Sequence, residues 1–441
     1  MANNTDIELR QQVIYSVFVR NHTPEGTFAA MERDLDRIKA LGTDIIWFMP
    51  IHPTGVLRRK GKDGSPYAIM DYRKTDPAMG TKEEFKHLAD EIHARGMKCI
   101  IDVVYNHTSP DSWLMENHPE YFKRDENGNT VTLVADWTDI ADLNYDVKEL
   151  WRYQIDTLKM WAEIVDGFRC DVAQRVPVEF WKQAREEVAT VRPGAIWLAE
   201  SSDKRFVKFI RDKNGYSATD SQLYEAFDIC YDYDIWHDFV MYLKDKLPLS
   251  AYISEIDKQE GTYPVNYVKM RFLENHDQER FTHYYKDKKI VLNYTAFMFM
   301  LKGTALLYAG QEKMLDHRPN FFDKDTVDFQ AGEDISDFIA TCARLKKQLL
   351  KADGIYHLIA NNEKNVAVVT CEMQQESAVG IFSLKGSTGN AEAYLKDGSY
   401  ENLLTNEKIQ VENGVLSCET MPVIVRTGTE NLVKPRFEGM L

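Results

Sequence analysis

Short apolar runs alternate with amphipathic stretches along the first 350 residues of the chain. The apolar runs have the length and composition of β-strands, and they fall at 12–19, 44–49, 98–104, 167–170, 196–199, 226–229, 267–273 and 304–308. Stretches with apolar residues at helical spacing lie between most of them, at 27–41, 82–95, 146–164, 178–190 and 334–350. Eight strands that alternate with helices predict an α/β fold, a closed (β/α)8 TIM barrel.

The pattern breaks in two places. Roughly 40 residues rich in Pro, Asp, Asn, Gly and Trp follow the third predicted strand, and a loop of that length is usually functional or a small subdomain. After residue 353 short alternating runs, at 366–371, 378–383, 391–395 and 422–426, are divided by Gly, Asn and Ser. We therefore predict a barrel over 1–106 and 146–352, an inserted subdomain over 107–145, and a C-terminal antiparallel β-sandwich over 353–441.

Composition narrows the range of partners. The 441 residues carry a formal charge of −15, which argues against nucleic acid or an anionic membrane and suits a neutral substrate. No run of about 18 apolar residues and no basic, apolar leader is present, and none of the six Cys forms a C-x-x-C pair. We expect a cytoplasmic protein with free, buried thiols. The sequence does not determine its oligomeric state.

Four predicted strands end in polar residues that can perform chemistry. These strand ends are Asp102–His107, Gly167–Asp171, Ile196–Glu200 and Phe272–Asp277. In a strand, Arg169 and Asp171 point to the same face, so the guanidinium would hold the carboxylate ionised, as a nucleophile requires. Glu200 follows an apolar segment, where desolvation would raise its pKa, as a general acid requires. Alone, each feature is often structural, but a parallel barrel brings all its strand ends to one mouth.

Two carboxyls that flank a bond, one as acid and one as nucleophile, are the design of retaining glycosidases. The chain also resembles the α-amylase family of glycoside hydrolases over nearly its whole length. The family's four catalytic regions match the four strand ends. Further matches are Ile14–Phe18, Tyr67–Tyr72, Asp76–Thr81 and Ala141–Asn144.

The resemblance implies the catalytic roles. Asp171 would be the nucleophile that forms a covalent glycosyl-enzyme, and Glu200 would protonate the leaving oxygen and then activate water. Asp277 would bind sugar hydroxyls and favour an oxocarbenium-like ring; only the resemblance assigns this residue.

The resemblance also implies residues that bind the sugar or support the nucleophile. His107 and His276 would hydrogen-bond the sugar at the cleaved bond, and Tyr67 would stack on its apolar face. Arg169 would fix the nucleophile, with Asp102 behind it.

Some positions depart from the family pattern. Many family α-amylases carry a Lys-His pair where this chain has Gln174 and Arg175. In this respect the chain is closer to the neopullulanases and cyclomaltodextrinases of the family. Ala68 stands where exo-acting α-glucosidases carry Asp after the stacking Tyr, and this favours an open cleft and internal cleavage. Arg280 matches the partner Arg of those same glucosidases, so the mode of cleavage and the choice of α-1,4 or α-1,6 linkage stay open.

The evidence for a metal is limited. Asn106 matches the family's calcium-binding Asn, but we prefer a loop-orienting role because the inserted segment is short. The Asp-rich loop of the second common calcium site is absent, and no His/Cys cluster has zinc spacing. We predict no required metal, with bound Ca²⁺ as the alternative.

These observations predict a retaining hydrolase of α-1,4 bonds in maltodextrins and related α-glucans. A transglycosylase or an oligo-α-1,6-glucosidase of the same fold is the main alternative. A non-catalytic glycan-binding homologue is the third possibility, and such proteins normally lack one or more of the acids.

Overall fold

Eight parallel strands close into the predicted barrel in a computed structural model, which describes residues 4–433. Around the ring, the strands follow the order β1-β10-β9-β8-β7-β6-β3-β2. Their bounds are β1 (Val13–Val17), β2 (Ile45–Phe48), β3 (Lys98–Val103), β6 (Gly167–Cys170), β7 (Ile196–Ala199), β8 (Ile229–Tyr231), β9 (Val268–Arg271) and β10 (Thr304–Tyr308).

The sixth barrel strand was predicted at the wrong position. It is β8 and begins at Ile229, whereas the apolar run suggested 226–229. Ala226 and Phe227 donate main-chain hydrogen bonds back to Leu223 and so belong to a turn after α9 (Asp220–Leu223). Their side chains are buried all the same, which explains why the run looked like a strand.

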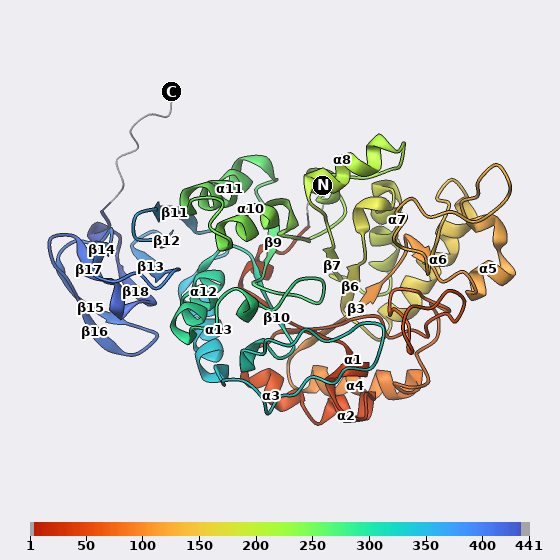
Figure 1. Cartoon of the computed structure of the whole chain (residues 1–441), viewed down its shortest axis with the longest axis horizontal. Helices are drawn as coiled ribbons and strands as arrows, with labels where there is room; N and C mark the ends of the chain where they lie inside the picture. The colour runs from red at the N-terminus through yellow and green to blue at the C-terminus, as the bar shows by residue number, and fades with distance from the viewer. Residues whose placement is uncertain (1–3, 434–441) are drawn as a thin grey trace.

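The barrel is surrounded by helices (Figure 1). The main ones are α2 (Phe28–Glu32), α3 (Leu35–Ala40), α4 (Lys82–Ala94), α6 (Lys148–Ala162), α7 (Val178–Val188), α8 (Lys204–Asp212), α10 (Tyr233–Leu243), α11 (Leu249–Thr262), α12 (Lys288–Met300) and α13 (Ser336–Leu349). The stretch 27–41 forms two helices rather than one, with Asp34 at the start of the second. Helix α12 showed no amphipathic period because nearly all its residues after Val291 are buried.

The segment after β3 and the C-terminal part are both built on antiparallel pairs. In the inserted segment, β4 (His107–Thr108) pairs with β5 (Ala141–Asp142). The C-terminal part has a four-stranded sheet, β11 (Ile355–Asn361), β12 (Val366–Glu372), β13 (Glu376–Ser383) and β18 (Val423–Gly428), and two pairs, β14 (Asn390–Glu392) with β17 (Val415–Ser417) and β15 (Gly398–Asn402) with β16 (Glu407–Val411).

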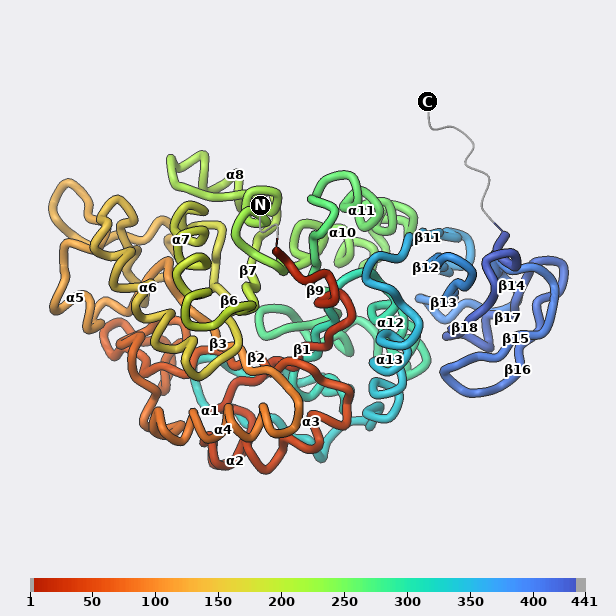
Figure 2. Tube along the Cα trace, turned by 180° about the vertical axis from the view of Figure 1, so that it is seen from behind, coloured from red at the N-terminus to blue at the C-terminus, as the bar shows by residue number. Residues whose placement is uncertain are grey.

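This C-terminal part lies at one end of the molecule beside α12, in both views (Figures 1 and 2). The run 391–395 yields only the short β14, because Tyr394 adopts a positive φ of 54° that a strand does not allow. The exact domain boundaries stay a prediction, and their ends at residues 1 and 441 lie outside the described residues.

All six cysteines fall within the described residues, and they are buried free thiols. Between residues 4 and 433, no helix is both long enough and apolar enough to cross a bilayer.

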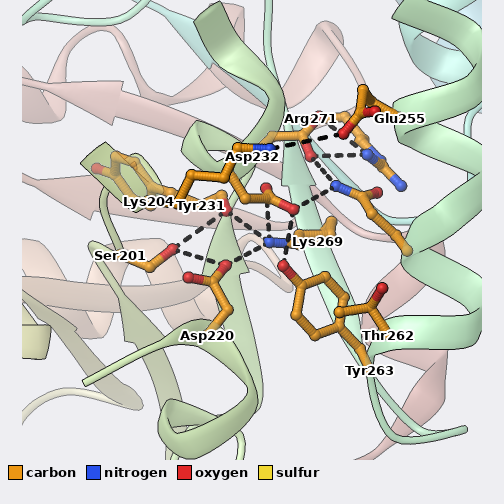
Figure 3. Close-up of polar contacts among 12 residues, drawn as sticks. Ser201, Lys204, Asp220, Tyr231, Asp232, Glu255, Thr262, Tyr263, Lys269 and Arg271 are labelled. Atoms are coloured by element: carbon orange, nitrogen blue, oxygen red, sulfur yellow. Dashed lines mark hydrogen bonds and ion pairs between the residues drawn. The ribbon is translucent and has the colours of Figure 1, made fainter. Parts of the chain in front are cut away.

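Two cations are buried between the barrel and its helices. Lys269 and Arg271 alternate along β9 with Val268 and Met270, which fill the barrel interior, so both cations face outward. Figure 3 shows their polar contacts. Lys269 Nζ lies 2.5 Å from Asp220 and 2.8 Å from Asp234.

The second cation is paired in the same way. Arg271 Nη1 lies 2.8 Å from Asp232, and the Gln259 side chain donates to Asp232 at 2.9 Å. Each charge therefore has a partner, which a buried ion requires.

We expect Lys269→Met to lower the free energy of unfolding by about 3–5 kcal/mol, because it leaves two carboxylates without their buried cation. Urea unfolding of the variant measures this directly. The matched control is Lys258→Met, which removes an exposed lysine that pairs with Glu255 and should barely move the midpoint. Equal effects of the two substitutions would contradict the structural importance of the buried cluster.

Candidate active site

The four polar strand ends meet at the mouth of the barrel. Asp102 lies on β3 and Arg169 on β6, and Asp171 follows β6 directly. Glu200 comes directly after β7, and its main-chain N–H donates to Cys170 O at 3.0 Å. The parallel register of β3, β6 and β7 therefore delivers these side chains to one place.

The Arg169 guanidinium is the centre of this cluster. Its Nη1 donates to both oxygens of Asp102 and to Asp171 Oδ1, each at 2.9 Å. Its Nη2 lies 3.0 Å from Glu200 Oε2, and its Nε donates to the Tyr231 hydroxyl at 3.0 Å. One fully buried cation thus contacts three carboxyls.

One cation does not neutralise three buried carboxyls, and their pKa values reflect this. Burial, and then the neighbouring charge of Glu200, raise the pKa of Asp171 well above its usual range, more than Arg169 lowers it. Burial raises the pKa of Asp102 to about 7. Arg169 lowers the pKa of Asp171, as the sequence predicts, but does not offset its burial, and the ionised nucleophile stays a prediction.

Glu200 has a more polar setting than its sequence neighbours suggested. Its Oε2 accepts a hydrogen bond of 2.7 Å from the Val172 main-chain N–H, in addition to the contact with Arg169. Val172 adopts φ 36°, an unusual conformation for a β-branched residue, and this turn directs the N–H at the carboxyl.

A second group of residues lies on the β9 side of the mouth. The Tyr67 hydroxyl bonds His276 Nε2 at 2.7 Å and donates to Asp102 at 3.2 Å, and the Tyr67 and His276 rings stack 5.7 Å apart. Burial lowers the pKa of His276 well below its ordinary value, so the ring is neutral. Asp277 lies 3.2 Å from His276 Nε2, and 37% of its side chain is exposed.

His107 is held at the base of the inserted segment. Its Nδ1 lies 2.9 Å from the Asn106 side-chain nitrogen, and its ring centroid is 5.7 Å from Trp137. Burial lowers the pKa of His107 to about 4, so this ring is also neutral. The barrel and the inserted segment are joined nearby by a buried ion pair, in which Arg175 Nη2 lies 2.9 Å from Asp142.

Arg280 was also predicted as a site residue, but its bonds go to other residues of the barrel mouth's surroundings, Glu274, Ala309 and His317. It is 1% exposed and donates to the Glu274 carboxylate at 2.6 Å, to His317 O at 3.0 Å and to Ala309 O at 2.8 Å. These bonds favour a role in holding the loop after β10.

The sequence analysis missed several residues around the mouth. Tyr231 supports Arg169 and ends a strand whose position was predicted wrongly. Phe206 and Phe209 on α8 continue a row of rings that begins at His107 and Trp137, with centroid separations of 6.5 Å from Trp137 to Phe206 and 6.1 Å from Phe206 to Phe209. In the sequence the two rings accompany Val207 and Ile210, as in an ordinary helix with a buried face, and only the structure shows that Phe209 is 41% exposed.

Comparison with known families gives a match over most of the chain. The family described as the α-amylase catalytic domain matches residues 12–123 and 110–348, and the bacterial α-amylase C-terminal domain matches residues 357–425. Among curated proteins, the chain is 27% identical over 368 residues to an α-amylase of Haloarcula japonica, covering 78% of this chain and 50% of that protein. The chain spans half or less of the length of such curated relatives.

Solved structures match along nearly the whole chain. An α-amylase from Lactobacillus plantarum is 42% identical, with a TM-score of 0.93 and coverage of 96% of this chain and 100% of that one. A maltogenic α-amylase from Thermotoga neapolitana is 32% identical, with a TM-score of 0.84 and coverage of 96% and 99%.

The raised pKa of Asp102 predicts how stability depends on pH. The folded value of about 7 lies above the ordinary value of about 3.9, so the folded protein keeps a proton that the unfolded chain releases. The stabilisation is complete below about pH 4 and is lost as the pH rises through about 7. Between about pH 5 and about pH 8, the wild type should therefore lose more unfolding free energy than Asp102→Asn, measured by urea unfolding. Parallel losses in the two proteins would refute the assignment.

Proposed function

Because the chain belongs to the α-amylase family, we propose that it is a retaining glycoside hydrolase that cleaves α-1,4 bonds in maltodextrins and related α-glucans. One observation carries this proposal: Asp171 and Glu200 lie on the two terminal nitrogens of the same guanidinium. Their carboxyls are therefore close together, as in retaining enzymes, where the separation is roughly 5–5.5 Å.

The reaction has two steps on these residues. Asp171 attacks the anomeric carbon as the glycosidic bond breaks, and Glu200 gives its proton to the departing oxygen, so a glycosyl ester forms on Asp171. Water then attacks the same carbon, Glu200 takes a proton from it, and the bond to Asp171 breaks. Glu200 supplies the proton that the leaving oxygen needs in the first step, while Arg169 stays bonded to Asp171.

The neighbouring polar groups suit a neutral sugar. His107 and His276 are neutral, and one nitrogen of each ring is already bonded, to Asn106 and to Tyr67 respectively, so at most the other nitrogen can bond a sugar hydroxyl. Asp277 accepts hydrogen bonds from hydroxyls next to the cleaved bond. Tyr67 offers its ring to the apolar face of the same sugar.

The aromatic row extends the site on the side of the acid. It runs from His107 through Trp137 to Phe206 and Phe209 on the helix that follows Glu200. The leaving part of the substrate lies on this side, because Glu200 must reach its oxygen. Rings there suit several sugar units, which supports an oligosaccharide as the substrate.

The same row favours one alternative. A sugar bound along it is placed to replace water in the second step, so transglycosylation is the second candidate function. An oligo-α-1,6-glucosidase differs from our proposal in linkage alone.

We propose that no metal is required. Asn106 is bonded to His107, and Asp142 of the inserted segment is already neutralised by Arg175. Within residues 4–433, no three or more His, Cys, Asp or Glu side chains gather as they would around a metal ion. We also propose a cytoplasmic site of action on short oligosaccharides, which suits six buried free thiols and a net charge of −15.

Product analysis tests the function. We expect maltoheptaose to yield shorter maltooligosaccharides in the α-anomeric form, and EDTA should change neither the rate nor the products. The control is Asp171→Asn, which should lose turnover by a factor of about 10⁴ or more and still bind the substrate. An active Asp171→Asn variant, or products longer than the substrate, would overturn the hydrolase proposal.

The acid assignment has its own test. Glu200→Gln should slow maltooligosaccharides about 10²–10⁴-fold, because their leaving oxygen needs a proton, and should spare the first step on an activated aryl or fluoride glycoside. Burst kinetics on the activated substrate separate the two steps. A loss of equal size on both kinds of substrate would remove Glu200 from this role.

A further inference from the structure

We propose that two interlocked loops close one side of the active site, so that the enzyme removes one or two glucose units from the non-reducing end of an α-glucan. The inference rests on the proposed function, because it takes Asp171 as the nucleophile and Glu200 as the acid. The two loops are the strand-2 loop, residues 49–81 after β2, and the strand-8 loop, residues 309–335 after β10. Together they are called the latch.

The latch is held by main-chain hydrogen bonds between distant segments. The N–H groups of Asp63 and Gly64 donate to Phe322 O at 2.9 and 3.0 Å. The Asp63 carboxylate accepts from the Lys324 N–H at 2.8 Å, across 261 residues of sequence. In Figure 1 the teal chain after β10 extends across toward the red chain after β2.

A third segment fixes both loops to the barrel. Helix α1 (Val19–His22), which follows β1, carries Arg20 and Asn21, and both are buried. Arg20 donates to Gly64 O at 3.2 Å and also to Phe321 O. Asn21 Nδ2 donates to Asn320 O at 2.9 Å. Because the middle of each loop is bonded to α1, we take the latch as a fixed wall rather than a mobile lid.

The latch stands across the mouth from the acid. In the closed ring of strands, β1 lies four positions from β7 in either direction, and β2 and β10 flank β1. Glu200 follows β7, so the leaving sugar lies on that side. The glycosyl unit that stays on Asp171 must then extend toward β1, and it meets the latch there.

The wall comes close to the reacting sugar. The Phe321 ring of the strand-8 loop lies 5.5 Å from the ring of His276, which the mechanism places against that sugar. Tyr67 of the strand-2 loop stacks on the same His276 ring. In this proposal the two rings are the wall against which the substrate chain ends on this side.

The two ends of the cleft therefore differ. The acid side carries the row that ends at the 41% exposed Phe209, whereas the opposite side ends at Phe321. An α-glucan can enter only with its non-reducing end against the latch. The open cleft that Ala68 suggested is open on the acid side alone, because the latch replaces the missing Asp as the closure.

Two substrates that differ only at the chain end test this. We would compare an aryl maltoheptaoside with the same compound blocked at its non-reducing end by a 4,6-ethylidene group. The blocked compound should react at less than about a hundredth of the rate of the free one, because the acetal does not fit between Phe321 and Asp171. The first labelled products of the free compound should be shorter by one or two glucose units.

The outcomes separate this inference from the proposed function. If both compounds react at equal rates, the latch does not limit the donor side, while the hydrolase proposal stands. If neither reacts although Asp171 and Glu200 are intact, the proposed function itself fails. Phe321→Ala should raise the rate on the blocked compound about tenfold or more, whereas the matched control Phe329→Ala, whose ring packs on His22, should not. No gain in Phe321→Ala would exclude Phe321 as the wall.

Discussion

A single buried guanidinium organises this active site. Arg169 contacts Asp102, Asp171 and Glu200, which come from three neighbouring strands, and its remaining nitrogen is held by Tyr231 from a fourth. An ion with no access to water is tolerable only if it is paired, so these four strands must register correctly for the barrel to be stable. The geometry of catalysis is therefore enforced by the same requirement that stabilises the fold.

Most strands and helices of the barrel could be predicted from the sequence, because barrel strands and the helices that cover them have different hydrophobic periods. The meeting of the candidate catalytic residues could be predicted for a related reason, since parallel strands place their carboxyl ends together whatever their separation in sequence. The β8 strand was misplaced because Ala226 and Phe227 are buried in a turn, and burial alone does not distinguish a turn from a strand.

Other features of the site depend on contacts that no local pattern encodes. Local spacing placed Arg169 beside Asp171, but it gave no hint that Glu200 shares the same cation, and the neighbouring charge of Glu200 helps to raise the pKa of Asp171. Arg280 matched a family position, although the fold uses its donors for Glu274 and two carbonyl oxygens. Phe321 and Asp63 lie outside every motif that the sequence offered, and their contacts appear only when distant segments meet.

The bonds between α1 and the latch also bear on how the protein is made. The wall depends on bonds among Arg20, Asp63 and Lys324. The ribosome makes Arg20 and Asp63 early, and Lys324 follows 261 residues after Asp63. A ribosome-bound chain can already contain Asp171, Glu200 and Asp277 when the segment around Lys324 is still missing. Such an incomplete chain lacks the bonds that join the two loops, so the wall can form only after the segment around Lys324 has been synthesised.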